Sequence, residues 1–415
     1  MKKFISILIL SLVFTMPAMA LPRVFEGVNE GAPYKIIVPE NWNGTLFMYA
    51  HGYRDLADHP GEVDITRADV VPYNNLETQT RLLAKGFALA GSAYRFNGWA
   101  VDEGAQDTLR VKILFKELLG EKPKRTILWG DSMGSLVALK SVETLGNAYD
   151  GVIAGCHLGA GVLKVFDRSI NFLLAFDLLF GMPESWGTPG DMRDDLDFET
   201  EVLPFFTNIL KDEKNMAKME FMRTLSYGNG KDPEIYYNPD SNASVFFQLY
   251  FGTEARAQLE RKIGGAFVDN TMTNYALTAE EFDYLQSLGL NTDELLKKMN
   301  TVKFKGNADL RSLLELSYVP AGTPQVPLIT ISNLQDLVTT TENTTVYKTK
   351  VINNRREEFY LPLFTSNPGH CLWSPNQVVT VVDQMYSWLN NRQKPQADSF
   401  PREIGFIEHN PGPWR

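Results

Sequence analysis

A serine between two glycines, placed where an apolar strand runs into a helix, limits the fold of this chain more than any other stretch. In the stretch ILWGDSMGSLVAL, residues 127–139, an apolar run is followed by GDSMG, and apolar residues then recur at helical spacing. The glycines are needed because such a sharp turn strains the backbone of Ser132 and leaves no room for flanking Cβ atoms. The pattern favours a serine held out of a sheet for chemistry over an ordinary tight turn.

Strand-like runs and helical patterns alternate on both sides of this turn. Helical patterns such as NNLETQTRLLAKG and TENTTVYKTKVINN separate the strand-like runs YKIIVP, GTLFMYAHG, GFALAGSAY, RTILWGDS, YDGVIAGCH, QVPLITISN and EEFYLPLF. A last helical pattern follows Ser374, a predicted N-cap, and has Pro375 at its first position. Alternation of this kind is typical of a mostly parallel sheet covered by helices on both faces, so the predicted fold class is α/β.

The alternation stops in the middle of the chain, and this divides the sequence into segments. Residues 21–157 carry the first part of the sheet, and residues 323–392 carry the second part. Residues 158–322 are mostly helical in pattern, which predicts a large helical insertion after the strand that follows the nucleophile helix. Residues 393–415 show no clear periodicity and are expected to form a tail over the surface.

The first twenty residues have the features of a signal peptide. Residues 1–20 combine Lys2 and Lys3, a short apolar run, and Ala18 and Ala20 in the pattern that signal peptidase reads. Cleavage after Ala20 predicts a protein exported to the periplasm or the extracellular space; the alternative is an uncleaved membrane anchor. No later run approaches the roughly 18 apolar residues of a membrane span, so stable membrane insertion of the mature chain is not expected.

The charge balance argues against a nucleic-acid partner. The full chain has 40 Lys and Arg residues against 50 Asp and Glu residues, and removal of the signal peptide leaves 38 basic residues and a net charge of −12. Such a surface repels phosphate backbones and anionic lipid headgroups. The sequence gives no indication of an oligomeric state.

The serine needs a base, and the base needs an acid that orients it. In sheets of this type the order along the chain is serine, acid, histidine. His370 lies in SNPGHCLWSPN, between a predicted strand and the last helix, and is the expected base, whereas His409 in the tail is expected to be structural. Asp336 follows an apolar strand and is the expected acid; the nearest alternative, Glu342, lies at a helix start, where carboxylates are favoured by the helix dipole.

An oxyanion needs two preorganised N–H donors. One is the backbone amide of Met133, which follows the serine, and the other is expected from the loop in FMYAHGYRD, where Tyr53 offers its backbone amide or, alternatively, its phenol. His51 in the same stretch is expected to be structural. Trp99, which follows a strand in YRFNGWAVDEG, and Asp131, beside the serine, are candidates for the substrate pocket.

The motifs HGY, GDSMG, LQDLV and GHCLW, in this order, resemble those of the α/β-hydrolase superfamily. Within it the chain is similar to secreted bacterial carboxylesterases and lipase-like enzymes with a large helical cap, and the resemblance covers residues 21–157 and 323–392. It implies a serine esterase acting on small-molecule or polymeric esters, with Ser132, Asp336 and His370 as the triad and no metal or organic cofactor. Alternatives are an exopeptidase or amidase on the same triad, or a binding protein without catalytic activity.

Three departures from related branches are informative. HGYRD replaces the His-Gly-Gly-Pro-Gly of prolyl-aminopeptidase-like enzymes, and a serine replaces the aspartate of dehalogenases and epoxide hydrolases. Tannase and feruloyl-esterase relatives often have cysteines directly before the serine and after the histidine, and here only Cys371 matches. Cys156 ends the strand beside the nucleophile strand and should lie near Cys371, so the two residues form either a disulfide or two separate buried thiols.

Overall fold

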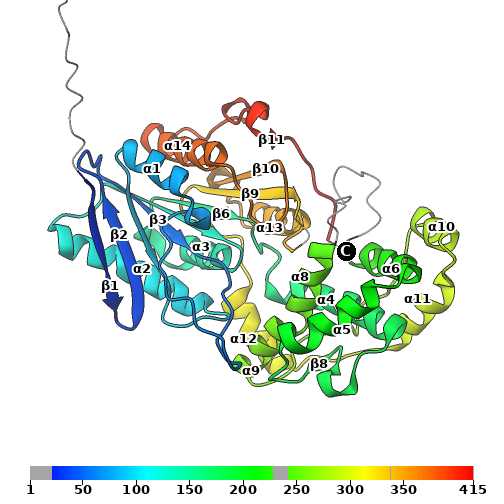
Figure 1. Cartoon of the computed structure of the whole chain (residues 1–415). Helices are drawn as coiled ribbons and strands as arrows, with labels where there is room; N and C mark the ends of the chain where they lie inside the picture. Colours follow the sequence, from blue (N-terminus) through cyan, green and yellow to red (C-terminus); the bar gives the residue numbers. More distant parts are fainter. Residues whose placement is uncertain (1–20, 228–241, 337, 415) are drawn as a thin grey trace, which may run out of the picture.

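A nine-stranded, mostly parallel sheet forms the centre of the computed structural model, which describes residues 21–227, 242–336 and 338–414 (Figure 1). The strand order across the sheet is β1-β2-β4-β3-β5-β6-β9-β10-β11. The predicted α/β class is therefore confirmed. The predicted signal peptide, residues 1–20, lies outside the described residues.

The sheet is parallel in its middle and antiparallel at its edges. Neighbouring parallel strands β4, β3, β5 and β6 are buried on both faces, which explains why their sequences are continuous apolar runs instead of alternating ones. In sheet order the strands are β1 (Arg23–Asn29), β2 (Ala32–Val38), β4 (Ala88–Ser92), β3 (Thr45–Ala50), β5 (Arg125–Asp131), β6 (Gly151–Gly155), β9 (Leu328–Gln335), β10 (Tyr360–Pro368) and β11 (Phe406–Ile407).

Helices cover both faces of the sheet, as Figure 1 shows. Leu82 of α1 and Val382 of α14 belong to the apolar core on one face, and Phe115 of α2 and Val137 of α3 belong to the core on the other. Ser374 caps α14 with a reciprocal capping box, so the predicted N-cap is confirmed. These helices are α1 (Leu76–Ala84), α2 (Val101–Leu119), α3 (Met133–Thr144), α13 (Glu342–Asn353) and α14 (Pro375–Asn391).

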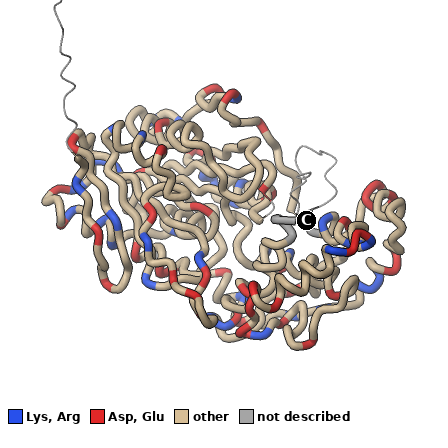
Figure 2. The backbone as a smooth tube through the Cα atoms, in the orientation of Figure 1, with Lys and Arg blue, Asp and Glu red and all other residues tan. Residues whose placement is uncertain are grey.

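Between β6 and β9 the chain leaves the sheet and forms a mostly helical insertion. Its helices pack beside the sheet and its flanking helices, and acidic and basic residues are interspersed around its outside (Figures 1 and 2). The insertion contains α4 (Val162–Phe180), β7 (Gly187–Thr188), β8 (Asp191–Met192), α5 (Leu203–Leu210), α6 (Met216–Tyr227), α8 (Asn242–Gly252), α9 (Glu254–Ile263), α10 (Ala279–Ser287), α11 (Thr292–Thr301) and α12 (Ala308–Tyr318). Across the described residues, none of the helices combines the length and the apolar character needed to span a bilayer.

The C-terminal tail does more than cover the surface. Phe406 and Ile407 form β11, which pairs antiparallel with β10 at the edge of the sheet. From there the chain continues toward the insertion, where Trp414 lines a cavity (Figure 1). The absence of periodicity in the sequence concealed both contacts, since a two-residue strand and a single aromatic anchor leave no repeating pattern.

The first turn of α3 packs closely against the end of β3 at Gly134. A Cβ atom added there would lie 2.2 Å from the carbonyl oxygen of Ala50 and 2.5 Å from that of His51. We therefore expect Gly134→Ala to lower the free energy of unfolding by about 3 kcal/mol or more, because overpacking displaces backbone here. Denaturant titration checks this, with Gly412→Ala as the control, since a Cβ at Gly412 meets nothing within 4 Å. Equal stability of the two variants would contradict the prediction.

Candidate active site

The turn between β5 and α3 holds Ser132 in a strained conformation. Its φ is 55° and its ψ is −124°, a region that residues other than glycine rarely adopt. Both flanking glycines are required sterically, since a Cβ on Gly130 would lie 2.0 Å from the carbonyl oxygen of Gly134. The strain directs the hydroxyl of Ser132 away from the strand, toward the loops that follow β3 and β10.

The structure brings Ser132, His370 and Asp336 into one hydrogen-bonded chain. His370 Nε2 lies 2.8 Å from Ser132 Oγ, and His370 Nδ1 lies 2.8 Å from Asp336 Oδ2. The two carboxyl oxygens of Asp336 also accept hydrogen bonds from the backbone amide and hydroxyl of Thr339 at 3.0 and 2.8 Å. The acid is thus fixed in place, and it can hold the imidazole with Nδ1 protonated and Nε2 facing the serine.

The residues considered as alternatives lie elsewhere. Glu342 begins α13 and faces Arg168, with an oxygen–nitrogen distance of 3.9 Å. His409 stands edge-on to the ring of Phe364. His51 is buried and stacked on the ring of Tyr94, and burial lowers its pKa to about 3, so it is a neutral structural group.

The loop after β3 packs against the turn that carries Ser132. Gly52 lies directly against Ser132, since a Cβ on this glycine would stand 3.2 Å from the serine Cβ. The next amide in the chain belongs to Tyr53, and the amide after Ser132 belongs to Met133, at the positive end of α3. Within the described parts of the chain, neither amide has a hydrogen-bond acceptor. This is the arrangement that an oxyanion hole requires.

The strand order, the strained serine after β5 and the histidine after the last parallel strand together decide the architecture. The chain has the α/β-hydrolase fold. In this fold the carboxyl ends of the parallel strands meet at one edge of the sheet, which is why three residues distant in the sequence converge.

The comparisons with known proteins are remote. No family model matches the chain. An o-phthalyl amidase from Xanthobacter agilis is 32% identical over 141 residues, which is 33% of this chain and 28% of that protein. Among solved structures, an esterase from Aspergillus oryzae is 15% identical with a TM-score of 0.43, covering 90% of this chain and 80% of that one. The tannin acyl hydrolase from Aspergillus niger is 11% identical with a TM-score of 0.44, covering 90% and 79%.

Asp131, a candidate for the substrate pocket, is held under the nucleophile by three aromatic residues. Its Oδ1 accepts hydrogen bonds from the indole nitrogens of Trp129 and Trp373 at 2.7 and 3.2 Å, and Tyr49 donates to Oδ2 at 3.2 Å. Burial raises the pKa of Asp131 to about 6. The residue lines a cavity beside the serine, but its oxygens are already engaged, so it supports the nucleophile strand from below.

A disulfide joins Cys156 and Cys371, whose Cα atoms are 5.1 Å apart. Cys156 follows β6, and the backbone amide of Ser132 points at its sulfur from 3.2 Å. Cys371 follows His370 directly. The bond therefore ties the histidine loop to the strand beside the nucleophile strand. Tyr73 holds the same loop from another side, donating its hydroxyl to the carbonyl oxygen of His370 at 2.5 Å.

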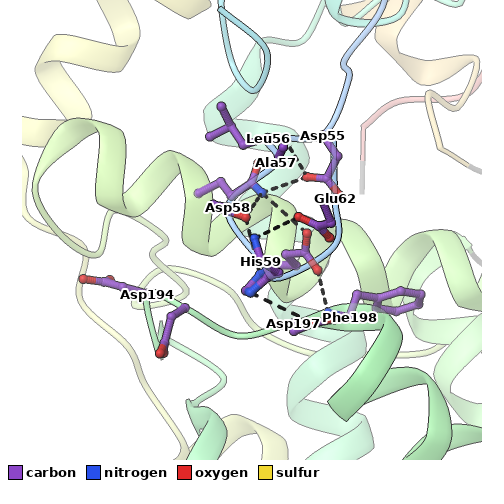
Figure 3. A network of polar contacts seen from close by, with 12 residues as sticks. Asp55, Leu56, Ala57, Asp58, His59, Glu62, Asp194, Asp197 and Phe198 are labelled. Carbon is purple, nitrogen blue, oxygen red and sulfur yellow. Dashed lines mark hydrogen bonds and ion pairs between the residues drawn. The ribbon is translucent and has the colours of Figure 1, made fainter. Parts of the chain in front are cut away.

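The loop that carries Tyr53 is fastened to the insertion by a polar network. The phenol of Tyr53 lies within hydrogen-bond distance of the Gln258 amide oxygen in α9 and 3.1 Å from Asp55 Oδ1. The phenol is therefore bound to these two residues instead of facing Ser132. Figure 3 shows Asp55 and His59 of this loop close to residues of the insertion. Burial, reinforced by the hydrogen bond to Asp55, raises the pKa of Glu254 to about 9, so Glu254 is protonated at neutral pH.

Two cavities meet at Ser132, and Tyr53 lines both of them. The wider cavity, about 470 Å³, extends along His370 and the loop after β3. The narrower one, about 30 Å³, extends under α4 and includes the predicted pocket residue Trp99, whose indole donates to the carbonyl oxygen of Ala255 at 2.7 Å. Ser132 therefore lies where two recesses of different width meet.

Sequence reasoning did not identify the insertion and tail residues that line these cavities. Arg168 in α4, Phe251 in α8 and Trp414 in the tail all line the narrower cavity. Their segments lack a motif, and their positions depend on how the insertion packs on the sheet. A signal was nevertheless present, because an arginine is unusual within the largely apolar run at residues 162–181.

The raised pKa of Asp131 predicts a pH dependence of stability. The folded state favours the protonated form, so this contribution is complete below pH 3.8 and is lost as the pH rises through about 6. Relative to Asp131→Asn, which does not titrate, the free energy of unfolding of the wild type should fall by about 2–3 kcal/mol between pH 4 and pH 7. Denaturant titrations at both pH values measure this, and Asp398→Asn, on the surface, should follow the wild type. A constant difference between the wild type and Asp131→Asn would refute it.

Proposed function

We propose that this chain is an exported serine hydrolase that cleaves carboxylic ester bonds through an acyl-enzyme intermediate. The observation that carries the proposal is the continuous chain of hydrogen bonds from Ser132 Oγ through His370 to Asp336, with distances of 2.8 Å at both links. The amides of Tyr53 and Met133 supply the complementary donors for an oxyanion. The features of residues 1–20 support export.

The proposed reaction has two halves with the same groups in reversed roles. His370 Nε2 takes the hydroxyl proton of Ser132 while Oγ forms a bond to the carbonyl carbon, and the two amides stabilise the negative oxygen. The protonated imidazole then gives its proton to the departing alcohol, which leaves an ester on Ser132. Water, activated by His370, adds to this ester and releases the acid, and the proton returns to Ser132. Asp336 stabilises the imidazolium in both halves.

The direction of the proton transfer assigns the two cavities. The leaving group receives its proton from His370, so it belongs in the wider cavity, which His370 lines. The acyl group then takes the narrower cavity with Trp99 and Met133 in its wall. Because α8 of the insertion lines both recesses and α4 lines the narrower one, we propose that the insertion serves as a cap that selects substrates.

An amidase or peptidase on the same triad is the second candidate. It is favoured by the 141-residue match to a protein named o-phthalyl amidase, although that match spans 28% of the amidase. The triad geometry suits either bond, since only the basicity of the leaving group differs. A binding protein without activity is disfavoured by the strained serine, because a strained backbone costs about 1–3 kcal/mol and persists where function uses it.

Covalent labelling tests the nucleophile. A fluorophosphonate probe should label the wild type on Ser132, and Ser132→Ala should abolish labelling and lower kcat/KM for ester hydrolysis by about four orders of magnitude or more. Ser287→Ala, an exposed serine in α10, is the matched control and should label like the wild type. Labelling that persists in Ser132→Ala would overturn the proposal.

A substrate panel separates the two enzyme candidates. We expect hydrolysis of 4-nitrophenyl esters of short fatty acids, and no measurable cleavage of the 4-nitroanilides of the same acids or of amino acids. The acyl groups match within each pair, so only the scissile bond differs. Faster release from the anilides would favour the amidase, and silence toward every substrate together with absent labelling would favour a binding protein.

A further inference from the structure

The two cavities that meet at Ser132 differ greatly in size. The narrower one has a volume of about 30 Å³, and the wider one has a volume of about 470 Å³. A single buried water molecule needs about 10–15 Å³ of such space, so the narrower cavity has room for about two groups of that size, such as the carbons of an ethyl group. The wider cavity falls within the range of about 300–1,000 Å³ that is typical of pockets for small organic ligands. An ester bound across Ser132 therefore fits with a small group on one side and a larger group on the other.

Part of the wall of the narrower cavity belongs to the aromatic core of the protein. Trp99 and Phe166 are both buried, and their ring centroids lie 5.3 Å apart. Phe166 also packs on Phe267 at 5.4 Å, and Trp99 packs on Phe251 at 6.2 Å. Because protein cores are close-packed, this wall cannot move outward without a loss of packing. The narrower cavity is therefore rigid where these rings line it.

Another part of the wall is Trp414, which comes from the tail and is only partly buried. Its ring stacks on the guanidinium of Arg168, with 3.7 Å from Cζ to the ring centroid, and Arg168 Nη1 donates to Thr340 Oγ1 at 2.7 Å. Upstream, the hydroxyl of Thr345 in α13 donates to the carbonyl oxygen of Pro411 at 3.1 Å. Stacking on a guanidinium that is itself hydrogen-bonded fixes the plane of the indole. The indole is thus held in place although it lies outside the close-packed core.

We infer that Trp414 closes the acyl cavity and limits the acyl group to acetyl or propanoyl, so that the preferred substrates are short-acyl esters of larger alcohols. The inference rests on the proposed function, which assigns the acyl group to the narrower cavity and the departing alcohol to the wider one. A larger acyl group would have to occupy the space that the indole fills. Trp414 takes no part in bond making, so its role is to determine specificity.

The chemistry balances without any further reagent. Ser132 Oγ bonds to the acyl carbon, and the alcohol leaves from the wider cavity with the proton carried by His370. Water then divides the acyl-enzyme and releases acetate or propanoate. The acyl group lies in the narrower cavity throughout both halves, so an acyl group that is too large should lower kcat/KM for the ester.

Two isomeric esters test this. Benzyl acetate and methyl phenylacetate have the same composition, but the ring is on the alcohol in the first and on the acyl group in the second. With the wild type, kcat/KM for benzyl acetate should exceed that for methyl phenylacetate roughly tenfold or more, measured by titration of the acid released. Trp414→Ala should raise kcat/KM for methyl phenylacetate roughly tenfold or more, because the phenyl ring gains an apolar space. Tyr284→Ala removes an exposed aromatic side chain that lines neither cavity and should keep the wild-type ratio.

The contrary outcomes are distinct. A wild type that hydrolyses methyl phenylacetate as fast as benzyl acetate overturns the inference, while labelling of Ser132 in the same protein leaves the proposed function standing. An unchanged ratio of the two rates in Trp414→Ala, with or without an equal loss toward both esters, makes Trp414 a structural residue and also overturns the inference. Absent fluorophosphonate labelling together with hydrolysis of neither ester removes the proposed function itself, and the inference with it.

Two further measurements serve if Trp414→Ala does not fold. In the wild type, kcat/KM for the 4-nitrophenyl esters of acetate, propanoate, butanoate and hexanoate, each divided by its rate with hydroxide, should fall roughly tenfold or more between propanoate and butanoate. Trp414→Phe keeps a smaller ring on Arg168 and should raise kcat/KM for methyl phenylacetate roughly threefold. A flat or rising series contradicts the limit on the acyl group, and an unchanged ratio of the isomeric esters in Trp414→Phe contradicts the role of Trp414.

Discussion

The contact between the first turn of α3 and the end of β3 is the constraint on which the site depends. Gly134 brings the helix so close to Ala50 and His51 that a single added carbon would meet backbone oxygen, and Gly52 lies against the serine in the same way. This one packing contact sets the place of Ser132 and the start of the loop that holds the Tyr53 amide. Ser132 and the loop that carries Tyr53 are therefore positioned together, and neither can shift without the other.

His370 reaches this site from a distant part of the chain, 238 positions after Ser132. The disulfide ties its loop to the end of β6, and Asn333 donates to the carbonyl oxygen of Gly369 at 2.9 Å. Phe247 of α8 approaches the His370 ring from the insertion, with 6.5 Å between the ring centroids. The loops at the carboxyl edge of the sheet therefore hold Ser132, His370 and Asp336, and the insertion supplies residues that line the cavities beside them.

This division explains what the sequence could predict. The α/β class and the convergence of Ser132, Asp336 and His370 follow from local patterns, because parallel strands place all their carboxyl ends at one edge. The sequence placed Trp99 near the same edge because it follows a strand, and Trp99 lines the narrower cavity. The positions of Arg168, Gln258 and Trp414 depend on how a helical insertion and an aperiodic tail pack against the sheet, and no repeating pattern encodes that. Sequence placed Asp131 beside the serine, but only its three aromatic partners reveal that it supports the strand.

The insertion and the loop that carries Tyr53 also meet at a pair of acidic side chains, Glu254 and Asp55. Burial, reinforced by the hydrogen bond to Asp55, raises the pKa of Glu254 in α9 to about 9, and Asp55 lies two residues after Tyr53. If both carboxyl groups were charged, their repulsion would push α9 away from that loop. A protonated Glu254 can donate a hydrogen bond to Asp55 across the boundary between insertion and sheet. Such a hydrogen bond costs less desolvation than a buried ion pair would cost at the same place. Gln258 of α9 also contacts Tyr53 and Asp55, so the position of the insertion and the position of the loop that carries Tyr53 are linked.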